Sequence, residues 1–268
     1  MKKGKRPLKA YKNLDFLTSS EARPLRILAE FSEPHFRFSK YNITSTIVFF
    51  GSARTLPKKT AKAAIFKYAE AYEQKPTRAN EKKLAAARLQ LRLSTYYEQA
   101  VELARLLTEW AMEKDSDRQK YYVCSGGGPG IMEAANKGAQ KAGGKSIGLN
   151  ISIPFEQDPN PYISDEFSFE FHYFFMRKLW FVYLAQAMVV FPGGFGTMDE
   201  MMEVLTLIQT KKIDRPMPII VFGQDYWREV IDLEAMARWG TISDEDLKLF
   251  NFVNSAEEAF RYIKKKLK

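Results

Sequence analysis

The sequence predicts an α/β protein with a doubly wound, Rossmann-like parallel sheet flanked by helices. Short apolar runs of strand length alternate with longer segments of helical periodicity along most of the chain. Glycine-rich turns follow two of these apolar runs, at 126–130 and at 193–196, as at the nucleotide sites of such folds. The 268 residues are enough for one large domain with a full core.

The expected elements follow the chain in order. Residues 1–40 are expected to form an N-terminal arm, helical over 14–38, and residues 41–268 a single nucleotide-binding domain. The nearly glycine-free stretch 58–114 indicates two helices broken near Pro76, with a helical insertion near 56–85. Strands are expected at 43–50, 121–124, 145–153, 167–171, 185–191 and 218–222. Helices are expected at 131–141, 176–187, 197–208 and 225–238, with a closing helix capped by Ser255.

Composition narrows the class of protein. No apolar run approaches the roughly 20 residues of a membrane span, and the basic start lacks the apolar stretch of a secretory signal. The single cysteine, Cys124, fits a reducing cytoplasm and is expected to be a buried structural thiol. With only His35 and His172 beside it, no metal-ligand cluster can be assembled from soft ligands, so we expect no metal site. We also expect no bound cofactor.

The net charge of +9 raises the question of nucleic acid. The excess lies mostly at the two ends and in the region 58–83, where solvated termini and helix faces explain it. The sequence therefore ranks nucleic acid well behind a small phosphorylated ligand.

The stretch after residue 191 predicts an anion site. Pro192 ends the preceding strand because proline has no N–H for a ladder. Gly193, Gly194 and Gly196 then allow a sharp turn and a close approach to a ligand, and Thr197 is expected to cap the following helix. A helix N-terminus behind such a turn offers N–H groups and a positive dipole end, so phosphate is the expected occupant.

Two further turns are expected at the same edge. Gly51, Ser52 and Arg54 follow the first strand and are expected to contact the ligand. The turn at 126–130, with Gly127 and Gly128, does not fit a dinucleotide site, because Ile131 stands where the third glycine belongs and the ribose-binding acid is absent.

Three acids accompany these turns. Asp199 and Glu200 are expected in the first turn of their helix, where two negative charges beside a phosphate indicate that at least one contacts another part of the ligand. Glu133 stands in the first turn of the helix after 126–130, as a dipole-complementing acid or as a pocket residue.

The motif Pro192-Gly193-Gly194-x-Gly196-Thr197-x-x-Glu200, together with Met176-Arg177-Lys178, resembles the signature of the LOG family. Members of this family are phosphoribohydrolases that split nucleoside 5′-monophosphates into free base and ribose 5-phosphate. The resemblance runs from about Tyr11 to the C-terminus. It implies that Arg177 and Glu200 are the essential pair, that the 125–134 segment lines the nucleotide pocket, and that the protein is a homodimer.

The residues fit this chemistry. Cleavage of an N-glycosidic bond passes through an oxocarbenium-like ribose, which needs a nearby carboxylate and a fixed phosphate. Glu200 offers the carboxylate, and Arg177, which is no proton donor at neutral pH, would hold Glu200 or substrate oxygens. His172 and Asp199 stay open as groups that stabilise the leaving base. Exchange of Glu200 for glutamine is expected to change stability by less than about 1 kcal/mol, as a lost dipole contact.

Two other functions stay open. One is a nucleotide or cofactor carrier without turnover on the same fold. The other is amino-acid decarboxylation with pyridoxal phosphate on Lys178. The preferred base, whether cytokinin-type, purine or pyrimidine, is also open. We further expect the aromatic stretch 167–175 and the helix 176–187 to supply a surface for a homodimer.

Overall fold

A computed structural model describes residues 6–113, 119–154 and 158–267. Its centre is a seven-stranded sheet in which all neighbouring strands are parallel, in the order β4-β3-β2-β1-β5-β6-β7. This is the predicted doubly wound α/β class. The strands are β1 (Thr46–Phe50), β2 (Tyr122–Ser125), β3 (Ser146–Ile151), β4 (Ser168–Phe171), β5 (Ala185–Val190), β6 (Ile219–Phe222) and β7 (Phe250–Val253).

The strand order reverses at β1. The chain first adds β2, β3 and β4 on one side of it and then crosses over to add β5, β6 and β7 on the other. In register, Phe50 at the end of β1 lies opposite Val190 at the end of β5. Beyond the turns that follow these two strands, the chain continues to opposite faces of the sheet, to α4 (Arg78–Glu113) on one face and α7 (Phe195–Gln209) on the other, and such a point is where ligands bind in folds of this kind.

Helices cover both faces of the sheet, and alternate residues of β1 point to the two faces. Ile47 and Phe49 pack with buried residues of α4, α5 (Ile131–Lys141) and α10 (Ala256–Lys266). Val48 and Phe50 pack with buried residues of α2 (Arg23–Lys40), α6 (Phe174–Tyr183), α7 and α8 (Gln224–Val230). The predicted structural thiol, Cys124, is buried in this second layer.

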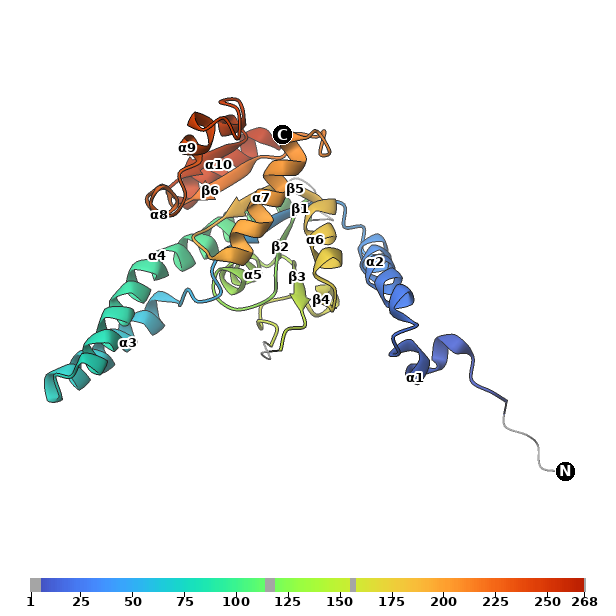
Figure 1. Cartoon of the computed structure of the whole chain (residues 1–268), viewed down its shortest axis with the longest axis horizontal. Coiled ribbons are helices and arrows are strands. Elements are labelled where there is room, and N and C mark those ends of the chain that lie inside the picture. The colour runs from blue at the N-terminus through green and yellow to red at the C-terminus, as the bar shows by residue number, and fades with distance from the viewer. Residues whose placement is uncertain (1–5, 114–118, 155–157, 268) are drawn as a thin grey trace.

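The N-terminal arm comprises the short η1 (Ala10–Lys12), α1 (Leu14–Leu17) and α2, and it extends away from the sheet (Figure 1). Glu30 on α2 ties the arm to the body. Its two carboxylate oxygens accept hydrogen bonds from the N–H groups of His172 and Tyr173, at 2.8 and 3.2 Å. Its carbonyl oxygen accepts a third, from the Trp180 indole, at 3.1 Å. The loop that leads into α6 is thereby fixed against the arm.

A second projection is the helical hairpin of α3 (Lys58–Gln74) and the first half of α4 (Figure 1). The turn between the helices contains Pro76, as predicted. Asn80 closes this turn, because its side-chain amide donates to the carbonyl oxygens of Ala71 and Lys75 at 3.0 and 2.9 Å. The second half of α4 is buried against α5 and α10.

The sequence located most elements and missed a few. The helix expected over 176–187 ends at Tyr183, because Ala185 already pairs with β1. The helix expected over 225–238 is two helices, α8 and α9 (Leu233–Arg238), since Asp232 caps a new start by accepting from the Ala235 N–H. The edge strand β7 was not predicted, and its four residues are mostly half-exposed and show no clear periodicity. The division into arm, domain and insertion stays a prediction.

Near the C-terminus the predicted cap is confirmed. The Ser255 hydroxyl accepts from the Glu258 N–H at 3.2 Å and so begins α10. Among the helices of the described residues, none combines the length and the apolar character that a membrane crossing requires.

Candidate active site

Three turns meet at the carboxyl edge of the sheet. They follow β1, β2 and β5, at 51–54, 126–130 and 192–196. The Ser52 N–H donates to the Pro192 carbonyl at 2.9 Å, and the Ile131 N–H donates to the Ser52 carbonyl at 3.1 Å. The predicted ligand-binding turns, distant in sequence, are thus joined by backbone hydrogen bonds around the point where the strand order reverses.

Several glycines in these turns are required by the fold itself. A Cβ on Gly51 would lie 2.7 Å from the Ile131 side chain. Gly127 has a φ of 75°, and a Cβ there would lie 2.0 Å from Asn150 Oδ1. Gly130, with a φ of 71°, would collide with the Ser52 carbonyl at 2.3 Å. Close packing between turns accounts for these three positions without a ligand.

A buried amide network holds the second turn. The Asn160 side-chain amide donates to the carbonyl oxygens of Gly127 and Gly128, at 2.9 and 3.1 Å, and to Asn136 Oδ1 at 3.0 Å. Asn136 also accepts from the Ser125 hydroxyl at 2.7 Å. Neither asparagine was predicted from the sequence to support this turn. Asn160 lies in an irregular loop where no periodicity points to burial, so only the fold reveals its role.

The third turn differs from its predicted form. The helix α7 begins at Phe195, two residues before the predicted cap, and Gly194 occupies the N-cap position. Thr197 is the third helical residue, and its N–H donates to the Gly194 carbonyl at 3.0 Å. The prediction of Thr197 as N-cap was therefore wrong. Its side chain fills the space beside Gly193 instead, where a Cβ would lie 2.2 Å from Thr197 Oγ1.

The remaining two glycines of this turn face open space. A Cβ on Gly194 or Gly196 would meet no atom within 4 Å among the described residues, and neither residue has a positive φ. Tyr226 stabilises this turn, because its hydroxyl donates a hydrogen bond to the Gly193 carbonyl at 2.7 Å. The fold thus leaves the start of α7 accessible at two positions where it does not itself need glycine.

Glu200 lies in the second turn of α7, since the helix begins at Phe195, and the expectation that it and Asp199 occupy the first turn was wrong. Its side chain is buried, with 4% of the residue exposed. Within the described residues, Glu200 Oε2 has no hydrogen-bond partner. Burial raises the pKa of Glu200 to about 7, although the charges of Lys178 and Arg177 oppose the rise.

Arg177 lies near Glu200 on α6. Its guanidinium stands 5.2 Å from the Phe174 ring centre and 5.4 Å from that of Phe181. Arg177 Nη1 also reaches the second turn, 3.8 Å from where a Cβ on Gly126 would lie. Burial lowers the pKa of Arg177, while the charge of Glu200 opposes this, so the guanidinium stays protonated. Arg177 Nε has no hydrogen-bond partner among the described residues.

Lys178 fixes α6 to α7. Its ammonium group forms ion pairs with Asp199 at 2.8 Å and with Glu203 at 2.7 Å, which lie one turn apart on α7. This clamp holds the two helices that carry Arg177 and Glu200. It also separates the two acids of the motif, because Asp199 is mostly exposed and paired whereas Glu200 is buried.

The other two candidate residues, Glu133 and His172, lie outside the Arg177–Glu200 pair. Glu133 accepts a hydrogen bond from the Tyr97 hydroxyl at 2.5 Å, which ties the start of α5 to α4. A role for Glu133 in binding stays a prediction. His172 is exposed beside the start of α6, and its ring packs edge-on against Tyr173. In the described part of the chain, no cluster of three or more histidine, cysteine or acidic side chains is arranged to hold a metal ion.

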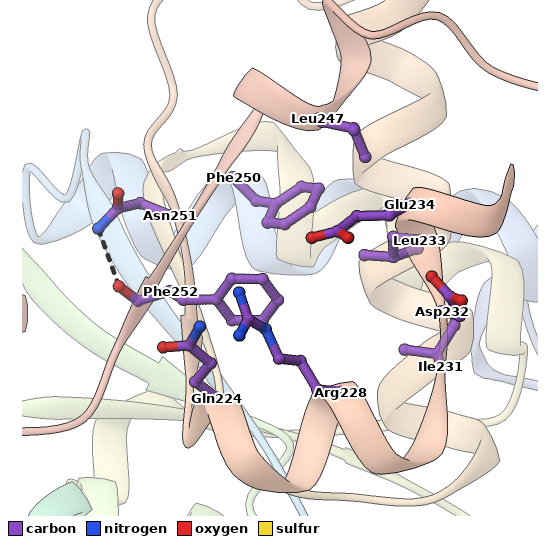
Figure 2. A pocket seen from close by; sticks show the side chains of 10 residues that line it. All are labelled: Gln224, Arg228, Ile231, Asp232, Leu233, Glu234, Leu247, Phe250, Asn251 and Phe252. Atoms are coloured by element: carbon purple, nitrogen blue, oxygen red, sulfur yellow. Dashed lines mark hydrogen bonds between the residues drawn. The ribbon is translucent and has the colours of Figure 1, made fainter. Parts of the chain in front are cut away.

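A separate hollow of about 680 Å³ lies at the β7 edge of the sheet (Figure 2). The rings of Phe250 and Phe252 line it, together with Arg228 and the acids Asp232 and Glu234 (Figure 2). No residue of the three turns or of the Arg177–Glu200 pair belongs to its lining. The candidate active site is therefore defined by the carboxyl edge at β1, β2 and β5 and not by this hollow.

The buried carboxylate predicts a pH-dependent stability. Folding raises the pKa of Glu200 from 4.5 to about 7, so the folded chain binds this proton more tightly than the unfolded chain. The contribution of Glu200 to the free energy of unfolding therefore falls as the pH rises from 4.5 to about 7. This difference corresponds to roughly 3 kcal/mol, in place of the change below about 1 kcal/mol expected from sequence.

Urea unfolding of the wild type and of Glu200→Gln from pH 4.5 to 8 measures this contribution of Glu200 to the free energy of unfolding. The stability of the glutamine variant relative to the wild type should increase across that range and then level off. Glu234→Gln, a change at an exposed carboxylate, is the control. A Glu200→Gln difference that stays constant with pH would contradict the effect of burial.

The chain is similar to known proteins over part of its length. Residues 132–263 match the family model described as "Possible lysine decarboxylase". Two relatives are pyrimidine/purine nucleotide 5′-monophosphate nucleosidases of Escherichia coli, from strains K12 and O157:H7. Each is 29% identical over 161 residues, covering 54% of this chain and 34% of the relative. The chain thus matches about a third of the length of these relatives.

Solved structures show partial likeness. An X-ray structure of the protein TM1055 is 20% identical and covers 82% of this chain and 99% of its own, with a TM-score of 0.48. The molybdenum cofactor carrier protein of Chlamydomonas reinhardtii is 16% identical and covers 84% and 98%, with a TM-score of 0.45. The family match includes α6, α7 and both motifs of the resemblance. Over residues 132–263 the chain is similar to the family described as possible lysine decarboxylases, in agreement with the resemblance to the LOG family.

Proposed function

We propose that this protein hydrolyses the N-glycosidic bond of nucleoside 5′-monophosphates to free base and ribose 5-phosphate. The observation that carries the proposal is the buried Glu200 carboxylate, which has no hydrogen-bond partner on Oε2 in the described residues and stands near Arg177. The similarity to nucleotide 5′-monophosphate nucleosidases supports the same reaction class.

The phosphate would bind at the start of α7. Phe195 and Gly196 are the first two helical residues, whose N–H groups have no partner within a helix. The open space at Gly194 and Gly196 allows an anion to approach these groups closely. Binding energy from the phosphate would then position the ribose against the carboxylate.

Glu200 would act in its ionised form. As the bond from C1′ to the base nitrogen lengthens, positive charge develops on the ribose, and a carboxylate in a poorly solvated site stabilises it. Water then adds to C1′ and gives up a proton to Glu200 or to solvent. The electron pair of the broken bond stays on the base nitrogen, which takes up a proton from solvent. A pKa of about 7 suits a group that accepts a proton near neutral pH.

Arg177 would complete the site as a fixed positive charge. A guanidinium is protonated throughout the physiological range and so donates hydrogen bonds without transferring a proton. Its charge lowers the pKa of Glu200, against the effect of burial, and so favours the ionised form. The Phe174 and Phe181 rings beside it restrict its orientation.

The arrangement of Lys178 argues against decarboxylation through pyridoxal phosphate. A lysine that forms a Schiff base must give up its proton. Burial alone would lower the pKa of Lys178, but its hydrogen bonds to Asp199 and Glu203 raise that pKa overall. A protonated lysine held by two carboxylates fits a structural clamp.

The reaction is tested with a panel of nucleoside 5′-monophosphates and the matching nucleosides. We expect release of free base and ribose 5-phosphate from at least one monophosphate, and far slower cleavage of the unphosphorylated nucleoside. Chromatography of the base and a reducing-sugar assay measure the two products. Equal turnover of nucleoside and monophosphate would contradict the proposed role of the phosphate in binding. Binding of a monophosphate without any turnover would favour the alternative function of a nucleotide carrier.

Gly196→Ala separates ligand binding from folding. A Cβ there meets nothing within 4 Å, and alanine is favoured over glycine in a helix by about 0.5–1 kcal/mol, so stability should stay equal or rise. If phosphate approaches this position, KM for the monophosphate should rise on the order of 10-fold or more, with a smaller effect on kcat. Gly51→Ala is the matched contrast, because its Cβ would collide with Ile131 and should lower stability. An unchanged KM in Gly196→Ala would exclude close approach of phosphate here.

Glu200→Gln tests the catalytic charge. Loss of a carboxylate that stabilises the transition state should lower kcat on the order of 10²-fold or more, while substrate binding survives. In the wild type, kcat should decline as the pH falls below about 7, because the ionised carboxylate is required. Glu234→Gln, at an exposed carboxylate outside the three turns and the Lys178 clamp, should lose much less. A glutamine variant with near-native kcat and weaker binding would make Glu200 a structural residue.

We further infer a homodimer through α6. Of the expected apolar surface, Phe167, Phe169 and Phe171 are buried inside the protein and cannot contribute. The exposed apolar side chains are instead those of α6, namely Phe174, Phe175, Leu179 and Tyr183. Light scattering at micromolar concentration should report a dimer, and Phe175→Glu should shift it toward monomer. Trp239→Glu, at an exposed residue elsewhere, is the control, and a monomeric wild type would refute the inference.

A further inference from the structure

The helical hairpin carries most of the net charge of the chain. Residues 58–92 contain ten basic and three acidic side chains, a net charge of +7 (10 − 3) out of +9 for the whole protein. The remaining residues are close to neutral. The basic residues are Lys58, Lys59, Lys62, Lys67, Lys75, Arg78, Lys82, Lys83, Arg88 and Arg92.

These side chains are exposed and unneutralised. All ten residues are exposed, and among the described residues none forms an ion pair with a carboxylate within 4 Å. Further along α4, where the helix packs on the body, Arg105 is paired with both Glu102 and Glu109 at 2.5 Å. The same helix therefore neutralises its cation near the core and leaves its cations free in the hairpin.

The spacing of the charges costs stability. The pairs Lys58–Lys62, Arg78–Lys82 and Arg88–Arg92 are each four residues apart on one helix, and so lie side by side. Like charges at this spacing destabilise a helix by about 0.2–0.5 kcal/mol per pair. A row of anions on a partner would convert this repulsion into attraction.

The hairpin is also accessible to a binding partner. It projects from the body of the protein as a pair of helices (Figure 1). Ala61 is the only fully buried residue of α3 within the described chain. At 17 residues α3 is about 25 Å long, and both helices therefore present cations along an extended, open surface.

We propose that this hairpin, residues 58–92, binds the phosphodiester backbone of nucleic acid. A linear polyanion matches charges distributed over about 25 Å, alongside which a duplex carries roughly one phosphate charge per 1.7 Å. A membrane surface fits less well, because the hairpin exposes only Phe66 and Leu89 as large apolar side chains in the described residues and so lacks an apolar face to insert. The proposal is independent of the nucleosidase reaction.

From the sequence alone, nucleic acid ranks behind a small phosphorylated ligand, because cations at the termini and on helix faces are commonly solvated. The structure adds two observations to the charge count. The cations of 58–92 are gathered on one projecting element, and their side chains have no acidic partners in the described chain. The small phosphorylated ligand and nucleic acid would then bind at different places on the molecule.

The experiment measures fluorescence anisotropy of labelled 20-nucleotide RNA and DNA of one sequence, and of the DNA duplex, at 50 and 200 mM salt. The full chain should bind all three with Kd on the order of 10⁻⁴–10⁻⁶ M and lose affinity steeply with salt. The variant Lys82→Gln/Lys83→Gln/Arg88→Gln/Arg92→Gln should weaken binding at least 10-fold. Its slope of log K against log salt should be shallower by about 3, since each phosphate contact contributes about 0.7–0.9.

The matched control removes four cations elsewhere, as Lys212→Gln/Lys264→Gln/Lys265→Gln/Lys266→Gln. It should retain affinity and slope within about twofold. Equal weakening of both variants would overturn the proposal, because net charge alone would then explain binding. The proposal is also overturned if the wild type fails to bind RNA and DNA at 50 mM salt. Two other results would have the same consequence. The hairpin variant could lose binding to phosphatidylserine vesicles but not to RNA or DNA, or the hairpin cations could instead drive salt-sensitive self-association. Circular dichroism checks that the variants are folded.

Discussion

Burial of one carboxylate sets the conditions that the rest of the site must meet. Transferring an ionised carboxylate out of water costs several kcal/mol unless other charges or hydrogen bonds offset it. Glu200 is offset by charge rather than by hydrogen bonds within the described residues, through Lys178 and Arg177 on the neighbouring helix. The incomplete offset leaves its pKa near 7. That value is useful for chemistry only if α6 and α7 stay in register, which the ion pairs of Lys178 with α7 secure.

The sheet topology determines what lies in front of this carboxylate. Because β1 and β5 are neighbours, the turn at Ser52 and the turn at Pro192 are joined directly, although about 140 residues separate them. The turn after β2 joins them through Ile131. Arg177 on α6 also lies near the turn after β2, with Nη1 3.8 Å from where a Cβ on Gly126 would stand. A parallel sheet wound in two directions places these loops together at one edge, whatever their sequence spacing.

Sequence patterns predicted what depends on neighbours along the chain. The helix Ile131–Lys141, the strands beside it and the Ser255 cap were located because periodicity and capping are local properties. The N-cap of α7 was misplaced by three residues, since a threonine after glycines resembles a cap, whereas Gly194 takes that position and Thr197 packs against Gly193. The burial of Glu200 and the role of Asn160 could not be predicted, because both follow from which elements the fold brings together. The missed strand β7 pairs with β6 through its backbone, which leaves little signal in side-chain types.

The glycines divide into two groups with different causes. Gly51, Gly127 and Gly130 are needed because another part of the chain occupies the place of a side chain, so a motif at these positions reports the fold. Gly194 and Gly196 have no positive φ, and no atom of the described residues lies close to the place of their Cβ, so folding alone would tolerate a larger residue there. A residue that the fold does not require needs another explanation, and close approach of a ligand to the N–H groups of α7 supplies one. The cations of the hairpin pose the same question, because within the described residues neither packing nor ion pairs with carboxylates require them. In both places function is inferred where structural stability alone would have allowed a different residue.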